Sequence, residues 1–438
     1  GNLRRRGLRL GERFGDDVFY SAMDAMLERN KRAMRELIRR TVPETKQYFE
    51  DYVCDDGMGM GPYKIACSMW REGDTCIFDF EGTDPQSIGS INFLLNEEMF
   101  KMFAGVYMIM VFDPQILFND GFYDLMEVRI PKGTLLKPLK PAALSCRTHA
   151  LGRIFDVLGG LLGQGNPAFM CAAGFSDSPH FMYSGYRANG EWYQLYQIGF
   201  GGIPGKPFGD GPDGHSLWPA FTNVPNEFLE SYFPLRIETY ETIPDSGGAG
   251  RFRGGNAIRI GYRFLEPGEI SIHDDRWLTY PWGVNGGLPG MRSKKIMVRT
   301  DGSEEKMPSK CDRIAVAAGD LLYFDTWGGG GCGDPLERET SKVAFDVEAG
   351  LVTVEGARRY GVVVSEDGVV DEAATAKLRA KMAKARGAVQ LFDRGFTSMD
   401  ELKGRCEAET TLPAPKAPEF TRRTASVKPK AKSKGKAA

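Results

Sequence analysis

The segment DSGGAGRFRGG (residues 245–255), followed by AIRIGYRF (residues 257–264), decides the class of fold. Its first part is a Gly-rich loop, and its second part carries the β-branched and aromatic residues typical of a strand. The same succession of a short strand and a Gly- or Pro-rich loop recurs throughout residues 166–334. Further strand candidates are residues 193–198, 235–242, 269–273 and 295–298. This part of the chain therefore predicts a β-rich body without regular βαβ units.

Helical patterns flank the β-rich body on both sides. Residues 16–40 carry apolar side chains near one helical face, and Pro43 ends the pattern. Further helix candidates are residues 94–112, 148–163, 343–349, 354–359 and 371–385. Residues 64–69 and 75–80 predict two strands joined by a turn, and a short strand is predicted at residues 125–130. The expected fold class is α+β, with a large β-rich body, Gly-rich loops and flanking helices.

The changes in pattern predict five segments along the chain. They are an N-terminal helical segment (1–45), an α+β domain (46–165), a β-rich domain (166–340), a C-terminal helical region (341–411) and a tail (412–438). The tail is Lys-rich, and its Pro, Ala and Lys composition is typical of disorder. A Lys-rich run of this size is usually a solvated tail rather than an RNA- or membrane-binding arm.

Composition and charge narrow the class of protein. The 438 residues carry a formal net charge of −2, which does not supply the basic field that nucleic-acid binding needs. No apolar run reaches the roughly 18 residues of a membrane span, and residues 1–6 lack a signal-peptide hydrophobic region. We therefore expect a cytoplasmic protein that binds neither nucleic acid nor membrane. The eight cysteines form no Cys-x-x-Cys pair, so buried or incidental thiols are expected rather than a disulfide framework or zinc ribbon.

The Gly-rich segments do not match a nucleotide-binding loop. Residues 199–206 end in Gly-Lys, but Pro207 follows where a P-loop requires Ser or Thr. The run Gly328–Gly331 precedes no helix pattern, which is typical of a tight turn. No Gly-x-Ser-x-Gly elbow is present either. The sequence therefore predicts neither an ATP site nor a nucleophilic serine on this chain.

Acidic, imidazole and amide side chains gather in the loop region of residues 210–230. The candidate catalytic residues are Asp213, His215, Asn223 and Glu227. Carboxylate and imidazole groups of this kind transfer protons or hold a metal ion. The alternative interpretation is that the Asp-Gly pairs in this region are simply turns.

A second set of residues is predicted to bind the substrate or a partner chain. These residues are Asp210, Arg251, Arg253, His273 and Asp274. The two arginines lie in the Gly-rich loop and can grip a carboxylate, whereas the His-Asp pair lies at a predicted strand end. The alternatives are turn formation for the loop and a surface ion pair for His273. The four His residues show no His-x-His or His-x-x-x-His spacing, so no metal ligands are predicted in this chain.

Five motifs follow one another in a recognisable order. Residues 79–86, DFEGTDPQ, resemble DFSGTDPQ with Glu81 in place of Ser, and residues 245–255 match DSGGAGRFRGG residue for residue. Residues 328–338 resemble GGGGYGDPLER, with Cys332 at the Tyr position. The other two motifs are residues 119–121 with 131–134, and residues 210–215 with 223–230. Up to about Gly361, the chain thus resembles the hydantoinase B family, which includes C-terminal regions of 5-oxoprolinases and subunits of ketone carboxylases.

This resemblance implies that the chain is the C-terminal two-thirds of a B-type subunit. Family members carry a further stretch before the residue equivalent to Gly1, and that stretch holds the His and Asp motifs of the family's metal site. A divalent metal, Zn, Mn or Fe, is therefore expected on that N-terminal region. A separate chain would supply the region, or else it has been removed.

The resemblance also implies a division of labour within a hetero-oligomer. An A-type, ATPase-like partner subunit would use ATP and Mg to phosphorylate a carbonyl or enolate oxygen of a small-molecule substrate. The B-type subunit would then complete the hydrolysis of a cyclic amide, as in hydantoinases and oxoprolinases, or the carboxylation of a ketone. The alternative is a non-catalytic scaffold subunit of the same kind of complex.

Overall fold

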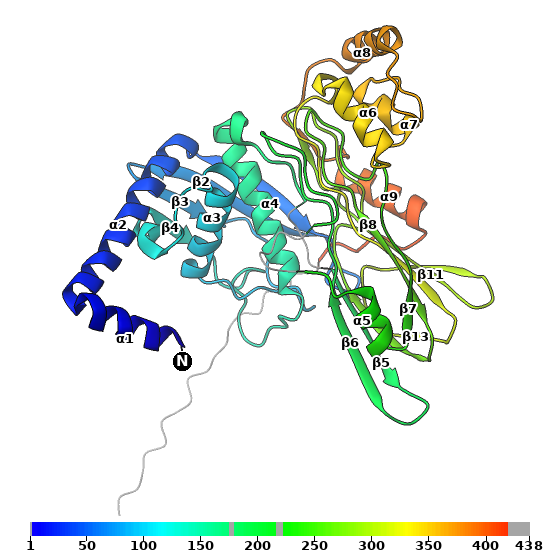
Figure 1. The fold of residues 1–438 in the computed structure, drawn as a ribbon, viewed down its shortest axis with the longest axis horizontal. Helices are drawn as coiled ribbons and strands as arrows, with labels where there is room; N and C mark the ends of the chain where they lie inside the picture. The colour runs from blue at the N-terminus through cyan, green and yellow to red at the C-terminus, as the bar shows by residue number, and fades with distance from the viewer. Residues whose placement is uncertain (1, 175–178, 216–221, 419–438) are drawn as a thin grey trace, which may run out of the picture.

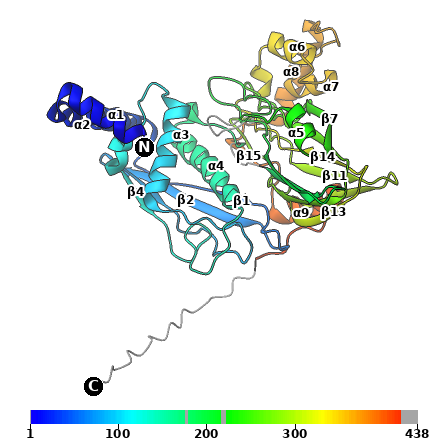
Figure 2. The same ribbon diagram turned by 60° about the horizontal axis from the view of Figure 1, so that its bottom comes forward.

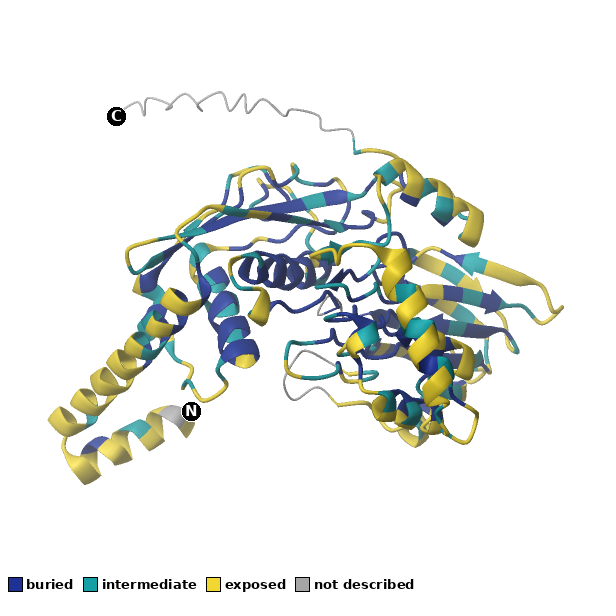
Figure 3. Cartoon of the chain, turned by 90° about the horizontal axis from the view of Figure 1, so that it is seen from above, coloured by how far each residue is buried: buried dark blue, intermediate teal, exposed yellow. Residues whose placement is uncertain are grey.

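The first part of the chain packs helices on a four-stranded sheet. A computed structural model describes residues 2–174, 179–215 and 222–418 (Figure 1). The elements, with the strands in sheet order, are α1 (Asn2–Phe14), α2 (Asp16–Thr41), β1 (Gln47–Val53), β2 (Tyr63–Glu72), β3 (Thr75–Asp79) and β4 (Met126–Arg129). The predicted helix at 16–40 and the hairpin formed by 64–69 and 75–80 are confirmed. Helix α1 and the first half of α2 are largely exposed (Figure 3).

Helix α3 (Glu97–Phe112) begins later than the apolar pattern that starts at residue 94. Asn96 caps it, because its side chain accepts a hydrogen bond from the Met99 N–H. The short 3-10 helix η1 (Asp120–Leu125) then leads into β4. Strand β4 pairs with β3 in parallel and completes the sheet.

Helix α4 (Arg147–Gly165) lies against β1 and β2, and its residues 149–163 are all buried. It confirms the helix predicted at 148–163. Glycines allow its close approach to the sheet, because a Cβ at Gly160 would collide with the ring of Phe49. The buried surface of α4 also carries Arg153 and Asp156. Charged side chains at such positions need partners, which other elements supply.

Two antiparallel sheets form the β-rich body (Figures 1 and 2). One sheet has the order β12 (Glu304–Met307), β11 (Lys294–Val298), β14 (Leu321–Asp325), β8 (Ile258–Phe264) and β7 (Leu235–Thr242). The other has the order β13 (Lys310–Val316), β9 (Gly268–His273), β5 (His180–Tyr186) and β6 (Trp192–Ile198). Both sheets contribute to one apolar core, for example Tyr262 from β8 and Phe181 from β5, whose rings stack with centroids 4.3 Å apart. The predicted strands in this region are confirmed.

Four Gly-rich segments, residues 199–205, 246–256, 282–290 and 327–333, lie beside one another in what we call the glycine bundle. Backbone hydrogen bonds join them, such as Gly255 N–H to the Ile203 carbonyl (2.8 Å) and Gly329 N–H to the Gly255 carbonyl (2.9 Å). The backbones are so close that a Cβ at Gly329 would collide with the Ile203 carbonyl. The glycines of residues 199–205 thus serve close backbone packing.

The helices beyond residue 340 have an apolar core of their own. They are α6 (Thr340–Glu348), α7 (Val354–Ala357) and α8 (Glu372–Arg386), with the 3-10 turns η3 (Pro335–Glu337) and η4 (Arg358–Tyr360) beside them. The chain then returns to the body through β15 (Phe392–Asp393), which pairs with β10 (Gly283–Val284), and through α9 (Met399–Thr410). The remaining short helices are η2 (Pro167–Phe169) and α5 (Asn226–Tyr232).

The start of the predicted tail makes backbone contacts. Lys416 N–H donates to the Gly59 carbonyl at 2.9 Å, and Gly61 N–H donates to the Lys416 carbonyl at 2.8 Å. Residues 419–438, the Lys-rich end, lie outside the described residues. The fold is α+β as predicted, and the five segment boundaries stay a prediction. None of the helices in the described ranges has the length and apolar character needed to cross a bilayer.

Candidate functional site

The charged side chains of α4 are neutralised in a buried network that joins the first sheet to the β-rich body. Arg276, just after β9, donates to Asp51 of β1 (Nη2–Oδ2, 2.6 Å) and to Asp156 of α4 (Nη2–Oδ2, 2.7 Å). Arg153 lies 3.0 Å from Asp156. Burial alone would raise the pKa of the Asp51 carboxyl, but the adjacent Arg276 and Arg153 guanidinium groups hold it below its usual value. Asp51 is therefore an ion at neutral pH although its side chain is only 2% exposed.

The network continues through Asp275 to strand β13. Lys310 Nζ lies 2.9 Å from Asp275 Oδ1, and Arg153 lies 3.5 Å from the other Asp275 oxygen. Burial opposes the ionisation of Asp275, but Lys310, Arg153 and His149 together lower its pKa well below the usual range. The network thus extends along α4 to His149, one turn from the N-terminus of the helix.

A second group of side chains, the Cys146 cluster, lies at that N-terminus. It consists of Cys146, His149, His273, Asp312 and Ser90. Cys146 is the N-cap residue of α4, and Ser90 Oγ lies 3.1 Å from its sulfur. His149 and His273 both hydrogen-bond to the thiol, and His273 Nε2 lies 3.1 Å from Asp312 Oδ1. The cluster therefore contains a thiol, an imidazole within hydrogen-bond reach and a carboxylate on the far side of that imidazole.

The electrostatics of this cluster favour an ion pair between sulfur and imidazole. Burial acts to raise the pKa of the Cys146 thiol, but hydrogen bonds from His149 and His273 lower it to about 5. The same hydrogen bond with Cys146 raises the pKa of His273 above its usual value; burial acts against this shift, and Asp312 adds to it. The two shifts together favour a thiolate beside an imidazolium over a neutral thiol beside a neutral imidazole.

The structure divides the residues that the sequence singled out for binding. His273 belongs to the Cys146 cluster, where its Nε2 lies 3.1 Å from Asp312 Oδ1. Asp274 is fully buried and pairs with Lys295, away from the cluster. Arg251 is exposed and lies 3.9 Å from Glu337.

Three other predicted residues meet in a second ionic group, which we call the Arg253 group. Arg253 binds Asp213 with two hydrogen bonds (2.6 and 2.9 Å), and Arg338 binds Asp210 in the same way (2.7 and 2.8 Å). Buried Asp346 of α6 contacts both arginines, at 3.3 and 2.7 Å. These residues tie the glycine bundle to the C-terminal helices. Arg338 is the last residue of the motif at 328–338 but was given no role from the sequence, and Asp346 belongs to none of the motifs.

Replacing Asp346 by asparagine is expected to lower the free energy of unfolding by about 1–3 kcal/mol. The loss is limited because Arg253 and Arg338 each keep another carboxylate partner. Urea titration of the variant and the wild type measures it, and the exposed Asp74→Asn, whose arginine partners are half-exposed, serves as the control. A change equal to that of the control would show that the group contributes no more than a surface ion pair.

The remaining catalytic candidates are not brought together with the Cys146 cluster. His215 is exposed, and its backbone N–H donates to the Gly201 carbonyl at 2.9 Å. Asn223 is exposed and hydrogen-bonds to Tyr240, and Glu227 is exposed on α5. Residues 216–221, which lie between them in the sequence, are outside the described residues. A catalytic role for these three residues stays a prediction.

Cys146 and His149 were not among the residues singled out from the sequence. The eight cysteines were expected to be buried or incidental, and all eight are free thiols, seven of them buried. The available signal was the Cys-x-x-His spacing of residues 146–149 immediately before a predicted helix, since that spacing places both side chains on the first turn. Within residues 2–174, 179–215 and 222–418, no group of three or more His, Cys, Asp and Glu side chains is arranged to hold a metal ion.

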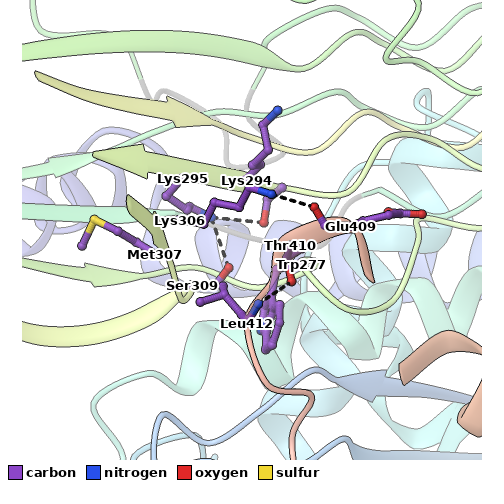
Figure 4. A pocket seen from close by; sticks show the side chains of 10 residues that line it. Trp277, Lys294, Lys295, Lys306, Met307, Ser309, Glu409, Thr410 and Leu412 are labelled. Carbon is purple, nitrogen blue, oxygen red and sulfur yellow. Dashed lines mark hydrogen bonds between the residues drawn. The ribbon is translucent and has the colours of Figure 1, made fainter. Parts of the chain in front are cut away.

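A shallow pocket between β11, β12 and α9 is a different kind of feature (Figure 4). Lys294, Lys295 and Lys306 line it together with Glu409. Lys295 is bound to Asp274, and Lys306 donates to the Glu409 backbone carbonyl at 2.9 Å. Lys294 lies 4.0 Å from Asp325, so all three lysines have contacts within the chain.

The α+β fold of this chain resembles that of solved structures. A crystal structure of the ATP-dependent caprolactamase from Pseudomonas jessenii superposes with a TM-score of 0.74 at 26% identity, covering 86% of this chain and 66% of that one. The model of the family described as Hydantoinase B/oxoprolinase matches residues 2–335. The chain belongs to this family.

Two relatives with curated sequences are named for different activities, one for a hydantoinase and one for a ketone carboxylase. The B-type subunit of a putative D-/L-hydantoinase from Pseudomonas sp. strain NS671 is 27% identical over 392 residues, covering 86% of this chain and 65% of its own length. The delta subunit of acetophenone carboxylase from Aromatoleum aromaticum is 24% identical over 432 residues, covering 88% of this chain and 62% of its own length. The chain therefore spans slightly less than two thirds of the length of these relatives.

Proposed function

We propose that the chain is the B-type subunit of a multi-subunit, ATP-dependent enzyme that hydrolyses a cyclic amide or carboxylates a ketone. The family match over residues 2–335 carries this proposal. Hydantoins and caprolactam are cyclic amides, and acetophenone is a ketone, so the relatives' names point to both substrate classes. Both classes present a carbonyl carbon that is unreactive until its oxygen is activated.

The division of labour between subunits is part of the same proposal. An A-type, ATPase-like subunit binds ATP and Mg and activates the carbonyl oxygen, and this chain completes the reaction. We assign a divalent metal and its ligands to the part of the relatives' length that this chain does not span, as the family resemblance implies. A scaffold role within the same complex is the other outcome of the test below.

The complex should convert one substrate class in an ATP-dependent manner. The purified complex is incubated with ATP and Mg, with either hydantoins and lactams, or ketones with bicarbonate, and both ADP and product are measured. Product from one class identifies the branch. The same product from the complex lacking this chain would assign it a scaffold role, and ATP turnover without product from either class would contradict the proposal.

A further inference from the structure

The Cys146 cluster has the arrangement of an activated nucleophile. Such a site needs a nucleophile, a base within hydrogen-bond reach and a third group that orients the base. Cys146, His273 and Asp312 occupy these positions, on α4, β9 and β13 respectively. Ser90 and His149 add two further contacts to the sulfur.

Cys146 differs from every other cysteine in the chain. Burial raises the pKa of the thiols of Cys54, Cys67, Cys76, Cys171, Cys311, Cys332 and Cys406. These seven are neutral at physiological pH and behave as small apolar residues. The thiolate form of Cys146 is the consequence of its imidazole neighbours and of its place at the first turn of a 19-residue helix.

The surroundings of Cys146 place it just below the surface. The residue is 1% exposed, whereas the His273 side chain is 16% exposed and the Asp312 side chain 70%. Tyr196 is 55% exposed, and Arg147, the residue after Cys146 in the chain, is exposed as well. His180 lies beside His273, with ring centroids 6.4 Å apart. A helix N-terminus and an arginine at the rim suit a substrate that carries negative charge.

We propose that Cys146 is a catalytic nucleophile that accepts an acyl group from a substrate carbonyl, with His273 transferring the proton and Asp312 positioning His273. This inference rests on the hydrolase branch of the proposed function. The substrate class is a small amide whose carbonyl has been activated by the ATP-dependent step, and the negative charge of that activated group faces Arg147.

The chemical step balances with water as the co-reactant. The thiolate attacks the carbon that carries the phosphorylated oxygen, a sulfur–carbon bond forms, and the bond from that carbon to the nitrogen breaks. A first water cleaves the phosphorus–oxygen bond, so that inorganic phosphate leaves, the carbonyl of the thioester is restored, and one proton of this water goes to the nitrogen. The His273 imidazolium gives its proton to the departing nitrogen. Neutral His273 then takes a proton from a second water, whose oxygen attacks the thioester carbon, so that the carboxylic acid leaves and the thiolate and imidazolium are restored.

Alkylation of the native chain tests the nucleophile without relying on turnover. Iodoacetamide is added between pH 4 and 9, and each cysteine is followed by peptide mass spectrometry. We expect Cys146 to react at pH 6 at least 10-fold faster than any other cysteine, with a midpoint near the pKa of about 5. Asp312→Asn should move this midpoint upward, because a less basic His273 stabilises the thiolate less. A Cys146 rate that equals the other thiols, or that rises up to pH 9 as for an ordinary thiol, would overturn the proposal.

Turnover by the complete complex tests the acyl transfer. Cys146→Ser should lose at least 100-fold in kcat, whereas Cys311→Ser, a neighbouring partly buried thiol, should not. Acid quenching of the wild-type complex during turnover should leave the acyl mass on the Cys146 peptide. Full activity of Cys146→Ser would overturn the nucleophile and leave the proposed function standing. If the wild-type complex converts no substrate, the proposed function fails, and the alkylation result alone decides whether Cys146 is a nucleophile.

Discussion

Arg276→Met is expected to lower the free energy of unfolding by about 3–5 kcal/mol, because it leaves Arg153 alone to neutralise two buried carboxylates, Asp51 at 4.0 Å and Asp156 at 3.0 Å. Arg276 is fully buried and holds Asp51 at 2.6 Å and Asp156 at 2.7 Å. Methionine has a similar length and restores no charge, so the effect reports on electrostatics rather than on a cavity. Urea unfolding followed by circular dichroism measures the change.

Arg39→Met is the matched control for this experiment. Arg39 pairs with Asp74 on the surface, with exposed fractions of 49% and 40%, so its removal should leave the free energy of unfolding close to that of the wild type. Neutralising the two carboxylates, which then have only Arg153 beside them, with Asp51→Asn and Asp156→Asn in the Arg276→Met background should recover part of the loss. Equal stabilities of Arg276→Met and Arg39→Met would show that the buried network does not hold the two parts of the chain together.

Gly329→Ala is expected to destabilise the chain by about 3 kcal/mol or more, which is at or beyond the upper end of ordinary overpacking. The added Cβ would collide with the Ile203 carbonyl, and backbone on the other side of residue 329 is fixed by its hydrogen bond to Gly255. Neither neighbour is a flexible side chain that can turn aside. Thermal unfolding and the yield of folded chain are the measurements.

Gly404→Ala provides the comparison, since it adds the same methyl group in open space. Gly404 lies within α9, and a Cβ there meets no atom within 4 Å. Alanine favours a helix over glycine by about 1 kcal/mol, so this variant should be as stable as the wild type or more so. A destabilisation by Gly329→Ala of less than about 1 kcal/mol would mean that the backbone of the glycine bundle can shift to accommodate the added methyl group at little cost.

Local pattern predicted the elements whose two sides differ in polarity. Strand β8 and helix α2 each place apolar residues at the period of their own structure, and both were predicted within a residue or two of their ends. Strand β1 escaped prediction because Asp51 lies on its buried side, where an apolar residue is the rule. Its partner Arg276 is 225 residues away, so no local window contains the reason for the aspartate.

The candidate site could be predicted only in part, for the same physical reason. His273 drew notice at its strand end, but the Cys146 cluster is assembled from α4, β9 and β13. Asp312 reaches His273 across a β-bulge between Cys311 and Ile314, where Arg313 adopts a positive φ of 57°. Such an irregularity changes which side chains face a neighbouring strand, and the sequence of β13 contains no pattern that predicts it. Asp213 was predicted as a catalytic residue and Arg253 as a binding residue, and their pairing with each other was not predicted.

The glycine bundle also bears on how the chain reaches its folded state during synthesis. Its hydrogen bonds join residues 203 and 255, 255 and 329, and 288 and 331. The earlier segments therefore find their hydrogen-bond partners only after a later segment has left the ribosome. Contacts of such long sequence separation form slowly, and the apolar surfaces beneath them stay uncovered in the meantime. The glycine bundle of the nascent chain cannot form completely until residue 333 has left the ribosome. We therefore expect chaperones to bind the first three quarters of the polypeptide during synthesis.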